Sequence, residues 1–105
     1  MNFISAEELN QKITSNSGIK ILDVRDSYEY DICEIGGIKI PMSEITDRIS
    51  ELDPNDNFAV MCRSGKRAEA VANLLEKEYQ FTSVNVLIGG ILGWIEAIDN
   101  SLEIY

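Results

Sequence analysis

Histidine is absent from the chain, and its absence removes a large class of chemistry. Without imidazole there is no Ser-His or Cys-His catalytic pair and no zinc site that needs a His ligand. Cysteine is also scarce, because Cys33 and Cys62 are the only two, too few for a secreted disulfide framework or a closed structural zinc site. We therefore expect no metal and no cofactor, and any chemistry has to use cysteine, carboxylates, cations or the backbone.

Basic residues are outnumbered: nine Lys and Arg stand against eighteen Asp and Glu, for a formal net charge of −9. Such an acidic chain is not expected to bind nucleic acids or anionic membranes, since their phosphate groups attract Lys and Arg. Long hydrophobic runs are missing too, because polar residues soon follow Met1 and no apolar stretch reaches about twenty residues. Neither a signal peptide nor a membrane span is predicted, and the cytoplasm is the expected location.

The chain has the length of one domain, predicted over residues 1–105. Short, apolar and β-branched runs predict strands at 19–24, 38–40, 58–62 and 83–87. Ser5 and Glu8 have the capping-box form of a helix start. Further helices are predicted from Ser27, from Ser43 through Leu52, after Arg67 and after Gly90. This alternation predicts a parallel sheet covered on both faces, with ligands bound just beyond the carboxyl ends of its strands.

The loop after the third predicted strand concentrates positive charge. It opens on Cys62, and three of the nine basic residues follow within it. Its other members are Arg63, Ser64, Gly65, Lys66 and Arg67. Unpaired N–H groups at the start of the next helix favour an anion here, and Gly65 lets the backbone curl so that several N–H groups converge. We expect an ionised Cys62 sulfur that attacks the outer sulfur of an anionic donor such as thiosulfate or a persulfide.

The two cysteines receive different interpretations. Cys62 could be only a small apolar side chain at the end of a buried strand, but the glycine and the three cations that follow it favour chemistry. Cys33 lies between Ile32 and Glu34 without local cations, so a packing role is expected for it. The other interpretation makes Cys33 a resolving thiol, which accepts sulfur from Cys62 or forms a disulfide with it.

Four segments, in order along the chain, resemble the signatures of the rhodanese-like domain family. They are Leu22-Asp23-Val24-Arg25-Asp26 with Glu29-Tyr30, Ile40-Pro41-Met42-Ser43, the loop from Cys62 to Arg67, and Gly89-Gly90-Ile91-Leu92-Gly93-Trp94. Residues 32–37 and the tail from Ile91 to Tyr105 look most like the rhodanese domain at the C-terminus of sulfur-carrier-activating adenylyltransferases. The chain departs from most members at residues 33–37, where Cys-Glu-Ile-Gly-Gly replaces Gly-His-Ile-Pro-Gly.

The resemblance implies a three-layer α/β fold with a central parallel sheet of about five short strands and helices on both faces. It also implies a sulfurtransferase, assayed as thiosulfate:cyanide sulfurtransferase, that carries sulfane sulfur as a persulfide on Cys62. The backbone of residues 63–67 would bind the anion, and Arg67 would fix the loop through a carboxylate partner. The implied small donor is thiosulfate or a persulfide, and the implied protein partner is a sulfur-carrier protein or a cysteine desulfurase.

Other motif residues receive roles in or beside this site. Asp23 and Arg25, at the end of a neighbouring strand, are expected to line the rim of the site; the alternative is a buried ion pair that shapes the loop. Gly89, Gly90 and Trp94 are expected to be structural, as a turn and a core anchor.

Two other functions stay open at this point. Cysteine phosphatases and arsenate reductases also hold a thiolate in an anion-binding loop, but they place one residue more between cysteine and arginine than the four that separate Cys62 from Arg67. The narrower loop suits a single sulfur atom better than a phosphoryl group. The second alternative is a non-catalytic rhodanese-like interaction module, although such modules usually lack the loop cysteine that this chain retains.

Overall fold

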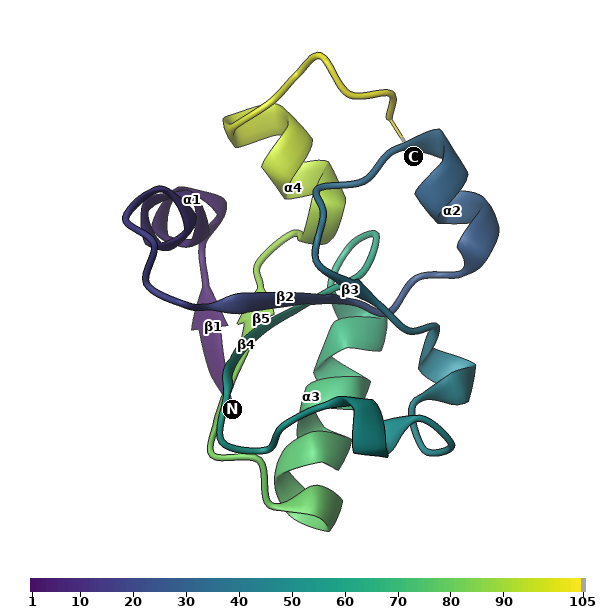
Figure 1. The fold of residues 1–105 in the computed structure, drawn as a ribbon. Coiled ribbons are helices and arrows are strands. Elements are labelled where there is room, and N and C mark those ends of the chain that lie inside the picture. The colour runs from purple at the N-terminus through teal and green to yellow at the C-terminus, as the bar shows by residue number, and fades with distance from the viewer. Residues whose placement is uncertain (105) are drawn as a thin grey trace.

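The computed structural model describes residues 1–104, so Tyr105, the last residue of the tail compared above, lies outside the described part. Figure 1 shows a central sheet with helices on both sides of it. Its strands are β1 (Asn2–Ile4), β2 (Lys20–Asp23), β3 (Ile38–Lys39), β4 (Asn57–Met61) and β5 (Ser83–Leu87). Their order across the sheet is β1-β5-β4-β2-β3, and each neighbouring pair is parallel. This is the α/β fold that the alternation predicts.

Helices form the two outer layers. The elements are α1 (Ala6–Thr14), α2 (Ser27–Ile32), α3 (Lys66–Tyr79), α4 (Gly90–Ala97) and two 3-10 helices, η1 (Met42–Glu44) and η2 (Ile49–Glu51). In Figure 1, α1, α2 and α4 lie on one side of the sheet, and α3 lies on the other side with the 3-10 helices. No helix within residues 1–104 has the length and the apolar character that crossing a bilayer needs.

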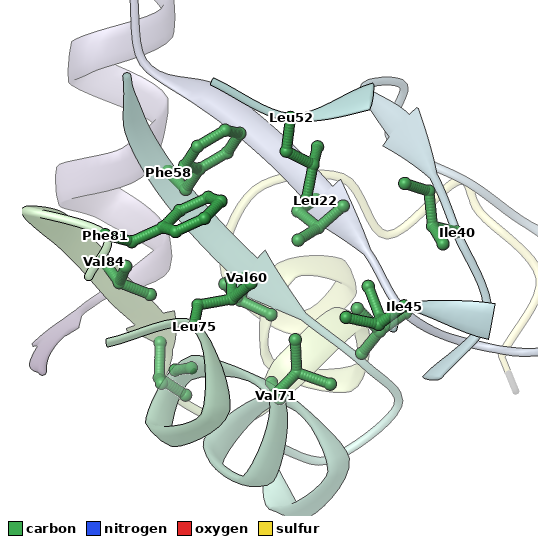
Figure 2. Packing of buried hydrophobic residues seen from close by; sticks show 14 of the residues in the cluster. Leu22, Ile40, Ile45, Leu52, Phe58, Val60, Val71, Leu75, Phe81 and Val84 are labelled. Carbon is green, nitrogen blue, oxygen red and sulfur yellow. The ribbon is translucent and has the colours of Figure 1, made fainter. Parts of the chain in front are cut away.

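The central strand β4 is buried on both faces. Because successive side chains of a strand point to opposite faces, Phe58 and Val60 enter one hydrophobic cluster while Ala59 and Met61 enter the other. Figure 2 shows the first cluster, in which Phe58 and Val60 pack with Leu75 of α3. Burial on both sides holds the carboxyl end of β4 firmly, and Cys62 is the next residue.

The N-terminal segment contains a predicted cap and an unpredicted strand. The capping box is confirmed, since the Ser5 hydroxyl accepts a bond of 3.1 Å from the Glu8 N–H and the Glu8 carboxylate accepts one of 3.2 Å from the Ser5 N–H. Strand β1 was not predicted, because three residues are too few to show alternation. Its pairing with β5, in which Phe3 lies beside Val86, makes these residues a strand.

The helix predicted from Ser43 through Leu52 is wrong. The segment instead forms η1 and η2, joined by turns. Ile45 and Leu52 do face the core, as their spacing predicted, but the β-branched Ile45, Thr46 and Ile49 weaken the helical preference. Two short 3-10 helices therefore bury the side chains of Ile45 and Leu52 in the core, and one continuous helix is not needed.

Candidate functional site

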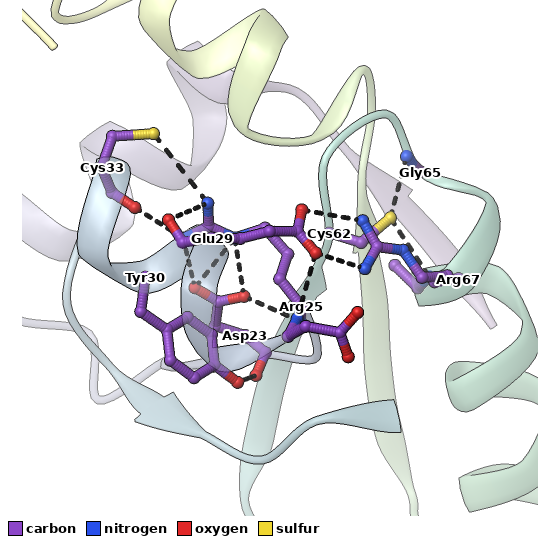
Figure 3. Close-up of polar contacts among 10 residues, drawn as sticks. Asp23, Arg25, Glu29, Tyr30, Cys33, Cys62, Gly65 and Arg67 are labelled. Atoms are coloured by element: carbon purple, nitrogen blue, oxygen red, sulfur yellow. Dashed lines mark hydrogen bonds and ion pairs between the residues drawn. The ribbon is translucent and has the colours of Figure 1, made fainter. Parts of the chain in front are cut away.

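The Cys62 loop, residues 62–67, begins directly after β4 and runs into the first turn of α3. Two backbone amides point at the sulfur: Cys62 Sγ accepts the N–H of Gly65 at 3.0 Å and that of Ala68 at 3.4 Å (Figure 3). Gly65 has a φ of +123°, a conformation that side chains rarely permit, so glycine is what lets the chain curl back over the sulfur. The loop and the first turn of α3 thus direct main-chain donors at one atom, an arrangement typical of an anion-binding site.

Burial separates the sulfur from the charges of the loop. Cys62 is only 1% exposed, whereas the side chains of Arg63, Ser64 and Lys66 are exposed. Arg67 is half-buried and turns back toward the body of the protein. The structure therefore brings backbone donors to the sulfur and leaves Arg63 and Lys66 on the outer surface, where they face approaching solutes.

Arg67 has the carboxylate partner that the resemblance implied, and the partner is Glu29 of α2. The guanidinium donates two bonds, of 2.7 and 3.0 Å, to the two oxygens of a carboxylate that is 1% exposed (Figure 3). Burial by itself would raise the pKa of Glu29, but the bonds and charge of Arg67, helped by the Asp26 N–H, hold that pKa below its ordinary value. Glu29 in turn raises the pKa of Arg67. The pair joins the Cys62 loop to α2.

Glu29 was quoted within a motif, but sequence reasoning gave it no role. A local signal existed: Asp26 and Glu29 have capping-box spacing, and the Asp26 N–H donates to Glu29 Oε1 at 3.1 Å. That bond explains the place of Glu29 at the start of α2. Its pairing with Arg67 crosses 38 residues of sequence, so only the folded chain reveals the partner.

Asp23 and Arg25 do not line an exposed rim, because both are 0% exposed. They form a buried ion pair instead, which was the alternative interpretation of these two residues. Arg25 Nη2 lies 2.8 Å from Asp23 Oδ2. Arg25 also donates to the backbone carbonyls of Cys33, at 2.9 Å, and Glu29, at 3.3 Å. The Asp23–Arg25 pair therefore anchors the middle and the C-terminal end of α2 to β2, and through α2 it holds Glu29 in place for Arg67.

Cys33 lies in the other hydrophobic cluster, together with Ala59 and Met61, and is 6% exposed. Both cysteines are free thiols. The nearest polar partner of the Cys33 sulfur is Arg25 Nη1, at 3.9 Å. In residues 1–104, no three side chains of the His, Cys, Asp and Glu types gather closely enough to hold a metal ion.

A hollow of about 170 Å³ lies beside the Cys62 loop. Its lining includes Ser64, Gly65 and Lys66 of the loop, Glu69 of α3, Phe3 in the middle of β1, and Ile88, the residue after β5. Phe3 and Ile88 are each 54% exposed, so apolar surface adjoins the cationic loop.

Comparison with known proteins gives consistent results. The sequence model of the rhodanese-like domain family matches residues 5–97 of this chain. The Bacillus subtilis (strain 168) protein YrkF, provisionally named a sulfur carrier protein, is 37% identical over 92 residues, which cover 87% of this chain and 49% of YrkF. The adenylyltransferase and sulfurtransferase UBA4 of Candida glabrata is 27% identical over 110 residues, which cover 94% of this chain and 25% of UBA4. The chain thus spans about half of the first relative and a quarter of the second.

Solved structures show the same similarity. A rhodanese-related protein from Thermoplasma volcanium superposes with a TM-score of 0.82 at 30% identity, covering 91% of this chain and 92% of that one. A rhodanese-like domain protein from Staphylococcus aureus gives a TM-score of 0.85 at 28% identity, covering 100% of this chain and 99% of that one. The agreement extends over the sheet and both helical layers.

Proposed function

The chain belongs to the rhodanese-like domain family, and from this premise we propose that it is a sulfurtransferase that carries sulfane sulfur as a persulfide on Cys62. The observation that supports the proposal most directly is the pair of amides, from Gly65 and Ala68, that donate to the Cys62 sulfur. A buried cysteine that only fills space has no need of such donors. Relatives named for sulfur carriage and sulfur transfer support the same chemistry.

The proposed reaction has two displacement steps. The Cys62 thiolate attacks the outer sulfur of thiosulfate, a new S–S bond forms, and the S–S bond of the donor breaks as sulfite leaves with the electron pair. A nucleophilic acceptor then attacks the outer sulfur of the persulfide. With cyanide as acceptor, thiocyanate leaves and the thiolate is regenerated. No proton has to be removed from an ionised thiol, so the reaction is compatible with a chain that has no histidine.

The loop supplies what each step requires. Exposed Arg63 and Lys66 attract an anionic donor toward the loop, against the net negative charge of the chain. The first amides of α3 have no acceptor within their own helix, so those of Lys66 and Arg67 are available to the outer sulfur of a persulfide. The ion pair of Arg67 with Glu29 keeps the loop in the shape that makes this possible.

The proposed partners are those of a sulfur relay in the cytoplasm. The small donor is thiosulfate or a persulfide, and the protein partner is a sulfur-carrier protein or a cysteine desulfurase. The apolar surface of Phe3 and Ile88 next to the loop supports a protein partner, because exposed apolar groups beside a reactive site favour association.

Intact-mass spectrometry after incubation with thiosulfate tests the proposal. We expect the mass of one added sulfur on the wild-type chain, its removal by cyanide with release of thiocyanate, and no addition to Cys62→Ser. The matched control is Cys33→Ser, which is expected to take up sulfur like the wild type. An aryl phosphate serves as the competing substrate. Hydrolysis of the phosphate without sulfur uptake would show a phosphatase instead, and neither activity would point to an interaction module.

A further inference from the structure

The first turn of α4 lies against the Cys62 loop, although α3 and β5 separate the two in the sequence (Figure 1). The N–H of Ile91 donates to the Cys62 carbonyl oxygen at 2.9 Å, and the N–H of Leu92 donates to that of Arg63 at 3.2 Å. Helix α4 has no side-chain cap at this end. The loop carbonyls therefore cap α4, and α4 in return holds the backbone of the loop.

Gly90 is what allows this close approach. A Cβ atom at Gly90 would lie 2.5 Å from the Cys62 carbonyl oxygen and would collide with that of Arg63 as well. Real Cβ atoms do not approach backbone oxygens so closely, and neither oxygen belongs to a side chain that can rotate away. Any side chain at this position forces α4 and the loop apart.

The two hydrogen bonds from α4 also set the direction of the first two backbone amides after Cys62. Within one trans peptide unit, the C=O and the following N–H point in opposite directions. Holding the Cys62 and Arg63 carbonyls toward α4 turns the N–H groups of Arg63 and Ser64 away from α4 and fixes the backbone that enters Gly65. The backbone then continues into Gly65, whose N–H reaches the sulfur at 3.0 Å. Cys62 is thus bonded by two helices, at its sulfur by the first turn of α3 and at its carbonyl by that of α4.

We infer that Gly90 is a positioning residue for sulfur transfer: its missing side chain lets α4 hold the Cys62 and Arg63 carbonyls, and so fixes the start of the loop backbone that leads to the Gly65 and Ala68 amides at the Cys62 sulfur. The inference rests on the proposed function and extends it to a residue for which the sequence predicted only a structural role. It assigns Gly90 no contact with the substrate.

Gly89 offers a matched control for Gly90. Both have positive φ, +76° at Gly89 and +59° at Gly90, so alanine introduces backbone strain at either position. A Cβ atom added at Gly89, however, would have the Gly93 Cα as its nearest neighbour, at 3.4 Å, and would meet no atom of the Cys62 loop within 4 Å. A difference between Gly90→Ala and Gly89→Ala therefore reports the contact with the Cys62 loop rather than the strain of the turn.

The experiment measures the rate of sulfur uptake from thiosulfate by intact mass, at a temperature where circular dichroism shows both variants folded. We expect Gly90→Ala to be slower than the wild type by about tenfold or more, and Gly89→Ala to stay within about twofold, since an amide aimed at a developing charge supports effects of this size. The amide NMR resonance of Gly65 should shift only in Gly90→Ala. Equal rates in the two folded variants, with an unshifted Gly65 resonance, would overturn the inference.

A second pair of variants decides the matter if Gly90→Ala does not fold. Leu92→Pro removes the N–H that donates to Arg63, and it breaks no bond inside α4 because the N–H groups of the first turn have no acceptor in their own helix, whereas Leu92→Ala removes the side chain and keeps the N–H. We expect slower uptake in Leu92→Pro than in Leu92→Ala, and equal rates would overturn the inference. Alkylation of Cys62 by iodoacetamide separates the two proposals. A wild type that takes up no sulfur contradicts the proposed function, while slower alkylation of Gly90→Ala than of Gly89→Ala still supports the positioning role.

Discussion

Cys62 and Cys33 are both free, nearly enclosed thiols, yet their surroundings differ in kind. The Cys62 sulfur accepts two backbone amides at 3.0 and 3.4 Å, from a loop that is open to solvent on its outer side. The Cys33 side chain belongs to a hydrophobic cluster, and its sulfur has one guanidinium nitrogen at 3.9 Å, from a guanidinium that is already bonded to Asp23. Burial therefore does not distinguish the cysteine that we propose as the sulfur carrier from the one expected to pack. The number and direction of the donors at the sulfur do distinguish them.

The largest expected effect comes from replacing each of the two cysteines with serine, one at a time. Cys62→Ser should abolish sulfur uptake, because a serine hydroxyl is not ionised near neutral pH and forms no persulfide. Cys33→Ser should retain uptake within about twofold while lowering stability by about 1–2 kcal/mol, since a hydroxyl is placed in an apolar cluster. Intact-mass kinetics and urea unfolding measure the two results. Loss of uptake in Cys33→Ser would make the two cysteines partners rather than opposites.

The second prediction concerns the Glu29 carboxylate, whose negative charge pairs with Arg67 of the Cys62 loop. Glu29→Gln keeps the shape of the side chain but takes one acceptor from Arg67, so the loop loses its two-point attachment to α2. We expect uptake to fall about tenfold and stability to fall by about 1–2 kcal/mol, a moderate value because Arg67 is partly exposed. Glu78→Gln, at an exposed position of α3, is the control and should change neither quantity. An unchanged rate in Glu29→Gln would show that the amides need no ion pair to hold them.

The third prediction concerns the pH dependence of the same pair. The pKa of Glu29 is lower in the folded chain than its ordinary value of 4.5, because Arg67 outweighs the effect of burial. The contribution of the pair to stability is therefore fully present above the ordinary pKa of a glutamate and is lost as the pH falls through the folded pKa. Urea unfolding at about pH 7 and about pH 4 should show a smaller loss of stability on acidification in Glu29→Gln than in the wild type. Parallel curves for the two proteins would contradict this assignment.

The smallest effect is expected from the outer charges of the loop. Lys66→Gln should reduce kcat/KM for thiosulfate by about twofold to threefold, and the reduction should shrink as salt is added, because an exposed charge acts at long range. Lys77→Gln, at the far end of the same helix, supplies the matched control. A loss of tenfold or more in Lys66→Gln would place that ammonium group in the site itself, not on its approach.

Local signals predicted the positions of these groups better than their partners. The apolar run of β4, the glycine in the loop and the three cations that follow Cys62 mark this cysteine as the candidate without any knowledge of the fold. Glu29 and Gly90 were visible as motif residues, but each acts on a residue far away in the sequence, Glu29 on Arg67 and Gly90 on the Cys62 and Arg63 carbonyls. Asp23 and Arg25 show the reverse error, because a polar pair near a strand end suggests a rim until its burial is known.

The sequence by itself determined the alternation of strands and helices, the cap at Ser5 and the loop that follows β4, because each depends on residues within a few positions of one another. Only the tertiary structure decided that Asn2–Ile4 is a strand, that residues 43–52 form short turns, and which residues support the Cys62 sulfur. The physical reason is the range of the interactions. Capping and periodicity act along the chain, whereas strand pairing, buried ion pairs and the close approach of α4 to the loop exist only when distant segments meet.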